Sequence, residues 1–193
     1  MLSSMPSSVL SLYRLSLKTR PIATKVLTGA TVAGSGDVAA QAIAWKASSS
    51  PLDFKEAWDF RRTLGVATFG ASYSGFFSHY LFCFYARRFP TVNVPNTVRY
   101  LNAAKLTAFH QLCTLPLIYF PSFFLTVEAV RGLPLHSNLT NFRSKFWDSY
   151  KVGALVFTPV MAGQFLFVPL PMQVLYITSA AFGWVTYLSY AAL

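Results

Sequence analysis

Charge is scarce in this sequence, and acidic charge is the scarcest. Charged residues make up 11% of the 193 residues, and only 6 of them are Asp or Glu, whereas soluble domains carry about 25% charged residues. So little charge cannot hydrate the surface of a soluble protein of this size. The 54% hydrophobic and 17% aromatic content also excludes a disordered chain, because disordered chains are polar and poor in aromatics. The composition therefore indicates a membrane protein.

The residue types that build metal centres and active sites are also few. Cys83 and Cys113 lie in apolar stretches without a CxxC or Cys/His pattern, which argues against a disulfide framework and a zinc site. The three histidines are scattered, and the motifs of metalloproteases, serine hydrolases, P-loop proteins and dinucleotide-binding proteins are missing. We therefore expect no enzyme activity, no metal and no cofactor.

Long apolar stretches separated by charged segments make up most of the chain. At about 20 residues per crossing, they predict an all-α, polytopic transmembrane bundle with four to five membrane helices. The stretches cover residues 26–45, 64–86, 106–127, 152–167 and 172–192. The last two form a predicted hairpin that turns at Val168-Pro-Leu-Pro171, and its first arm is short, which leaves the number of crossings at four or five. Pro116 and Pro121 predict a kink in the third stretch, and residues 87–105 and 128–151 are predicted loops.

Basic residues flank the apolar stretches. The formal net charge is +10, and this placement favours anionic lipid head groups over nucleic acid as the partner. Residues 1–20 form a basic segment without acids, typical of a mitochondrial targeting region or of the polybasic flank of a first span, and residues 21–193 form one predicted membrane domain. Each of the four charged regions holds four Lys or Arg, so the positive-inside rule predicts no orientation. A homo-oligomer is left open.

Polar side chains inside the apolar stretches are the candidates for function. Asp37 at mid-span costs at least about 3 kcal/mol and should face the bundle interior or water, with Gln41 one turn further on the same face. The other polar residues of this kind are His79, His110, Gln111 and Gln164. These six side chains either line a polar path across the membrane or hydrogen-bond between helices to hold the bundle together.

Two further patterns concern packing and anchoring. Gly29/Ala33 and Gly36/Ala40 are small-xxx-small pairs that allow helices to approach closely in lipid. The arginine pairs at 61–62 and 87–88 are predicted anchors at the membrane interface.

Several motifs resemble those of a known family. Gly36-Asp37 with Gln41, Asp59 with Arg61 or Arg62, and Gln111 with Pro116 resemble its signatures. The most specific part is the C-terminal block, formed by Phe165, Pro169, Trp184, Tyr187 and Ser189. On these residues the chain resembles the Mpv17/PMP22 family of small mitochondrial and peroxisomal membrane proteins. It departs from the pattern at Phe76, His110 and Gln173, where the family has proline, aspartate and arginine.

The resemblance implies an integral organelle membrane protein with channel activity. We expect a channel weakly selective for small solutes, in which Asp37 and Gln41 bias the pore. The acid-free basic N-terminus favours the mitochondrial inner membrane, with the peroxisomal membrane as the alternative. A different class of function is a non-conducting protein that organises a membrane complex, which the close-packing glycines fit equally well.

Overall fold

The computed structural model describes residues 9–48 and 53–192, and all regular secondary structure in these ranges is helical. The predicted all-α class is therefore confirmed for the described chain, and residues 1–8 of the predicted basic segment lie outside it. The elements in chain order are α1 (Val9–Thr19), α2 (Pro21–Ala47), α3 (Phe54–Ala57), α4 (Phe60–Phe69), η1 (Gly70–Phe77), α5 (Ser78–Arg88), α6 (Asn96–Phe109), η2 (His110–Tyr119), α7 (Phe120–Arg131), α8 (Leu135–Phe167), η3 (Leu170–Met172) and α9 (Gln173–Ala192).

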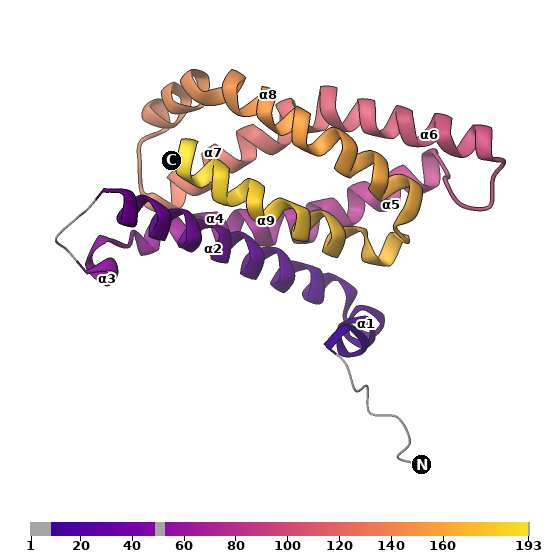
Figure 1. Ribbon diagram of the computed structural model, residues 1–193, viewed down its shortest axis with the longest axis horizontal. Helices are drawn as coiled ribbons and strands as arrows, with labels where there is room; N and C mark the ends of the chain where they lie inside the picture. Colours follow the sequence, from indigo (N-terminus) through magenta and orange to yellow (C-terminus); the bar gives the residue numbers. More distant parts are fainter. Residues whose placement is uncertain (1–8, 49–52, 193) are drawn as a thin grey trace, which may run out of the picture.

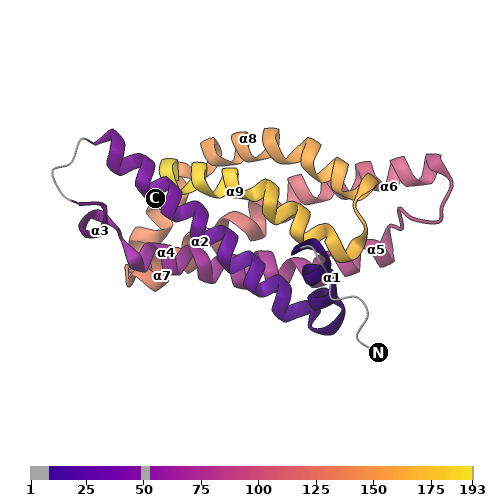
Figure 2. The same ribbon diagram turned by 60° about the horizontal axis from the view of Figure 1, so that its bottom comes forward.

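The long helices lie side by side along one axis and alternate in direction (Figure 1). α4, η1 and α5 follow one another without a break, as do α6, η2 and α7. α2 packs against η1 and α9, α4 packs against α7, and α8 packs against α6 and α7. The short helix α1 lies across one end of the bundle, next to the start of α2 (Figure 2).

The interior of the bundle is rich in aromatic side chains. Phe69, Phe120, Phe123 and Phe124 are almost fully buried, and the Phe69 ring meets the Phe123 ring edge-on with centroids 5.2 Å apart. Edge-to-face pairs of this kind add to the stabilisation that burial already supplies. The aromatic excess in the sequence thus serves packing at the junction of α4, η2 and α7.

The prediction of loops at 87–105 and 128–151 is wrong, because helices occupy much of both segments. α6 begins directly after Pro95, and α8 begins directly after Pro134. α7 ends directly before Gly132, whose φ of 80° is the left-handed conformation that suits glycine at a helix C-terminus. Proline and glycine therefore set the boundaries of these helices, and charged residues between them lie on helix surfaces. The predicted short arm at 152–167 is the second half of a 33-residue helix, and the turn that follows it is confirmed.

Two stretches of the described helices are long and apolar enough to cross a membrane, judged by length and composition. They are Asn96–Arg131 and Phe142–Phe167. The first joins α6, η2 and α7, and the second is the greater part of α8. They contain two of the expected membrane stretches, 106–127 and 152–167, and extend each of them into a segment that was expected to be a loop. The other three expected stretches are not among these helices, so the expected number of four to five crossings is not confirmed.

π-helical turns interrupt the two composite helices near their midpoints. η1 and η2 carry i→i+5 geometry over 8 and 10 residues, and η2 contains Pro116. Proline has no backbone N–H to donate, and in a membrane a local π adjustment is one way to satisfy the carbonyl that it leaves free. π turns are rare in helices and are found often at functional sites, and here they border the middle of the bundle.

Glycines bring α2 into direct backbone contact with its neighbours, as the small-residue pattern predicted. A Cβ added to Gly29 would overlap the Gly70 carbonyl oxygen, and one added to Gly75 would overlap the backbone of Val26. Gly36 faces α9, where an added Cβ would lie 3.3 Å from the Phe182 carbonyl oxygen. In lipid, such close approach replaces the hydrophobic effect as the source of helix association.

This contact makes a specific prediction for Gly29. Gly29→Ala should destabilise the bundle by about 1–3 kcal/mol, because the added methyl forces α2 and η1 apart. The measurement is the thermal midpoint of the protein in detergent. Gly183→Ala is the matched control, since nothing lies within 4 Å of a Cβ at Gly183, and its midpoint should be unchanged or higher. Equal midpoints for the two variants would contradict the proposed contact.

Candidate functional site

The structure distributes the six predicted polar side chains over three places. Asp37 and Gln41 belong to a buried network near the end of the bundle where α3 lies. The buried residues His110, Gln111 and Gln164 belong to η2 and α8. His79 contacts Lys25 near the opposite end of α2. Lys25 and Asp37 are separated by about 18 Å along α2, at the usual helical rise per residue.

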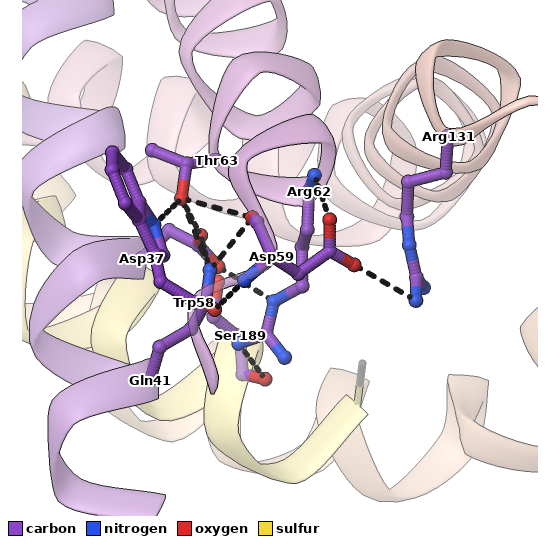
Figure 3. A network of polar contacts seen from close by, with 8 residues as sticks. All are labelled: Asp37, Gln41, Trp58, Asp59, Arg62, Thr63, Arg131 and Ser189. Atoms are coloured by element: carbon purple, nitrogen blue, oxygen red, sulfur yellow. Dashed lines mark hydrogen bonds and ion pairs between the residues drawn. The ribbon is translucent and has the colours of Figure 1, made fainter. Parts of the chain in front are cut away.

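Asp37 is the centre of the buried network, and its side chain is fully inaccessible. Its Oδ1 accepts a hydrogen bond from Arg62 Nε at 2.9 Å, which is also an ion pair. Its Oδ2 accepts from Gln41 Nε2 at 2.8 Å and from Thr63 Oγ1 at 2.7 Å (Figure 3). The expectations that Asp37 faces the interior and that Gln41 shares its face are confirmed.

The start of α4 positions the groups that meet Asp37. Asp59 caps this helix by accepting the Arg62 backbone N–H at 2.9 Å, a common role for aspartate at the first turn. The same residue donates its own backbone N–H to Gln41 Oε1 at 2.8 Å. Trp58 Nε1 donates to Thr63 Oγ1 at 2.8 Å. The cap thus fixes the backbone from which Arg62 and Thr63 reach Asp37.

Two longer-range contacts extend the network to four helices. Arg62 Nη2 donates to the Ser189 carbonyl oxygen in α9 at 3.0 Å, and Arg131 at the end of α7 pairs with Asp59 at 3.2 Å. Beside the network is an open hollow of about 330 Å³, lined in part by Gln41, Asp59 and Arg62. The prediction of Arg62 as an interface anchor is wrong, because a buried carboxylate needs a cation and Arg62 supplies it.

A second polar group lies in the middle of the bundle. A cavity of about 40 Å³ is bounded by η1, α5, η2, α8 and α9, and its polar lining comes from Tyr73, Ser74, Ser78, His110, Tyr119 and Thr178. Tyr73 OH and His110 Nδ1 have no hydrogen-bond partner among the described residues. A cavity of this size holds at least one water molecule, since about 10–15 Å³ suffices for one.

Two glutamines near this level are also unsatisfied. Gln164 is fully buried and Gln111 nearly so, and in the described part of the chain neither amide has a partner for its oxygen or its nitrogen. An unpaired buried polar group costs about 1–3 kcal/mol. His110, Gln111 and Gln164 therefore differ from Asp37 and Gln41, whose hydrogen bonds are made within the protein.

His79 belongs to a third and separate group. Its Nδ1 lies 2.9 Å from Lys25 Nζ and 4.0 Å from Cys83 Sγ. This group borders a cavity near α1 and η3, far along α2 from the Asp37 network. The sequence predicts either a place on a polar path or a hydrogen bond between helices for His79, and it gives no indication of the contact with Lys25.

Phe165, Trp184 and Ser189 of the C-terminal signature are buried, whereas Tyr187 is partly exposed. Trp184 Nε1 donates to Tyr119 OH at 3.1 Å, and the Tyr187 ring lies against Trp184 with centroids 5.4 Å apart. Phe165 meets the Tyr85 ring edge-on. Pro169 lies in the turn between α8 and α9, and Ser189 supplies the carbonyl that Arg62 binds.

An apolar helical bundle that buries Asp37 and several uncharged polar side chains between its helices is typical of an integral membrane protein. Comparison with known proteins agrees with this class. The model of the Mpv17 / PMP22 family matches residues 129–189. The Mpv17-like protein of Xenopus laevis is 30% identical over 164 residues, which are 85% of this chain and 75% of that protein. On this evidence the chain belongs to the Mpv17/PMP22 family.

Other relatives cover nearly the whole chain. Peroxisomal membrane protein 2 of Bos taurus is 26% identical over 97% of this chain and 91% of its own length. Protein SYM1 of Saccharomyces cerevisiae is 25% identical over 94% of this chain and 89% of its own length. No solved structure matches the chain significantly. The protein is thus an integral membrane protein of the mitochondrial inner membrane or the peroxisomal membrane.

Proposed function

We propose that the protein forms a channel, weakly selective for small solutes, in an organelle membrane. In this proposal four to five of the long helices cross the bilayer and the solute path follows the bundle interior. The proposal assigns no chemical reaction to the chain. Of the two membranes, it favours the mitochondrial inner membrane, because the sequence up to Asp37 contains basic residues and no acid.

The observation that carries the proposal is the unsatisfied polar group in the middle of the bundle. Tyr73, His110, Gln111 and Gln164 are buried with side-chain polar atoms that no described residue satisfies. A purely structural core has no use for such groups, since each one costs stability. Water or a polar solute passing between the helices would satisfy them. The adjacent π-helical segments η1 and η2 are of a kind that is frequent at functional sites.

The charge pattern supports weak selectivity. The polar groups around the central cavity are hydroxyls and an imidazole, which can each donate and accept hydrogen bonds and therefore favour neither cations nor anions strongly. Asp37 and Gln41 bias the path at one end in this proposal. Because Arg62 balances the Asp37 carboxylate at 2.9 Å, that bias is small.

The test is reconstitution of the purified protein in a planar bilayer. We expect discrete conductance steps, with a reversal potential close to zero in a salt gradient because the selectivity for charge is weak. A large reversal potential would contradict the weak selectivity. Circular dichroism and a cooperative thermal transition would show that the protein is folded. Absence of any current from such a folded protein would contradict the channel.

The second class of function is a non-conducting protein that organises a membrane complex. It is favoured by the tight glycine contacts of α2 and by the complete hydrogen bonding of Asp37. Both features stabilise one rigid arrangement of helices. Purification of a stoichiometric partner together with an electrically silent protein would support this alternative.

A further inference from the structure

The two ends of the bundle differ sharply in charge. Residues 1–25 and 87–105 hold eight Lys or Arg and no acid, whereas the rest of the chain holds the other eight together with all six acids. The acid-free segments contribute α1, the start of α2, the end of α5 and most of α6, which lie toward the same end of the bundle (Figure 1). We call this the basic end.

Lys25 is the buried cation of the basic end. Its side chain is only 4% exposed, and its one hydrogen-bond partner in the described chain is the imidazole of His79. None of the ion pairs between described residues includes Lys25. A buried ammonium without a counter-charge is costly, so this position calls for an anion.

Space for an anion lies directly against Lys25. A cavity of about 200 Å³ is lined by Leu17, Pro21, Lys25, His79, Cys83, Leu170 and Pro171. A second hollow of about 400 Å³ is lined by Arg14, Leu17, Lys18, Pro169, Pro171 and Met172. The two share Leu17 and Pro171, so they adjoin, with Lys25 and His79 lining one and the exposed Arg14 and Lys18 lining the other.

We propose that these adjoining hollows bind a phosphate group. Lys25 donates one N–H to His79 Nδ1, which leaves its other two N–H groups for a ligand and requires the neutral imidazole to carry its proton on Nε2 as a further donor. The guanidinium of Arg14 and the ammonium of Lys18 add charge at the outer hollow. Phosphate accepts several charge-assisted hydrogen bonds from different directions at once.

The chemistry fits a phosphate from two sources. Leu17, Leu170 and Met172 provide apolar walls, which suit the glycerol and upper acyl chain of a phospholipid whose headgroup reaches Lys25. A free inorganic phosphate would use the same polar groups without the walls. The proposal goes beyond channel activity and holds whether or not the protein conducts.

The experiment is isothermal titration of the full chain in detergent with three probes. They are dihexanoyl phosphatidic acid, dihexanoyl phosphatidylcholine and inorganic phosphate. Saturable binding of phosphatidic acid alone identifies an anionic lipid headgroup as the source, and saturable binding of inorganic phosphate as well identifies the phosphate group itself. Binding of neither, or equal affinity for the two lipids, would overturn the proposal.

Variants decide whether the binding uses this site. Lys25→Met keeps the length and apolar stem of the side chain and should weaken binding about ten- to hundredfold, the usual worth of hydrogen bonds from a charged donor. Lys46→Met is the matched control at the other end of α2, where Lys46 is exposed, and should bind as the wild type does. The double variant Arg14→Gln/Lys18→Gln changes only exposed side chains and should also weaken binding, with an unchanged thermal midpoint. Wild-type affinity in both the Lys25→Met and the double variant would refute the site.

Discussion

Replacing Gln164 with Leu should make the protein more stable and less conductive. Gln164 is fully buried in α8, and neither atom of its amide has a partner in the described chain. The leucine side chain has a similar size and no polar atom. The change should therefore raise the free energy of unfolding by about 1–3 kcal/mol, the usual cost of burying a polar group without a hydrogen-bond partner. If the Gln164 amide hydrogen-bonds to water or solute that passes through the channel, the same change removes this hydrogen-bonding group and should lower the conductance.

Measuring both stability and conductance distinguishes a functional role of Gln164 from a purely structural one. We would measure the unfolding free energy of the protein in mixed detergent micelles and its single-channel conductance in a planar bilayer. Gln173→Leu is the matched control, because Gln173 Nε2 already donates to the Val168 carbonyl at 3.2 Å. That variant should not gain stability and should conduct as the wild type does. A less stable Gln164→Leu protein, or one with unchanged conductance, would contradict the proposed role of Gln164.

Removing Arg62 should be the most damaging single change in the described network. Arg62→Met leaves the Asp37 carboxylate buried without its cation, and breaking a buried pair in this way costs about 3–5 kcal/mol. It also removes the hydrogen bond from Arg62 to the Ser189 carbonyl oxygen. We therefore expect a large loss in unfolding free energy in mixed micelles, together with weakened attachment of α9.

A double variant tests the cause. Asp37→Asn/Arg62→Met removes both charges and should recover part of the lost stability, because no unpaired ion stays buried. Lys151→Met is the surface control, since Lys151 and Asp148 are 3.7 Å apart with both side chains well exposed, and it should change stability by less than about 1 kcal/mol. If the double variant is no more stable than Arg62→Met alone, the ion pair does not explain the loss.

Sequence reasoning succeeded where one local pattern decides the outcome. The position of Asp37 and Gln41 on one face of α2 follows from their spacing, and the turn at 168–171 follows from its two prolines. The close contacts of Gly29 and Gly36 follow from the spacing of small residues. These features require no knowledge of which helices are neighbours.

The features that the sequence does not predict are of two kinds: contacts between residues far apart in the chain, and helices whose charged residues suggest loops. Arg62 meets Asp37 across 25 residues, and Lys25 meets His79 across 54, distances at which helix periodicity carries no information. The charged residues of 87–105 and 128–151 suggest loops, although helices occupy much of both segments. Charged residues are compatible with a helix surface, and only the flanking Pro95, Gly132 and Pro134 mark the true boundaries.

The hydrogen bond from Arg62 to Ser189 spans 127 residues, and this separation has a consequence for biogenesis. Chains are synthesised from the N-terminus onward, so α2 and α4 are made well before α9. Until α9 arrives, one donor of Arg62 faces the inside of an incomplete bundle without its acceptor. The last helix therefore completes a polar contact that the earlier helices leave open.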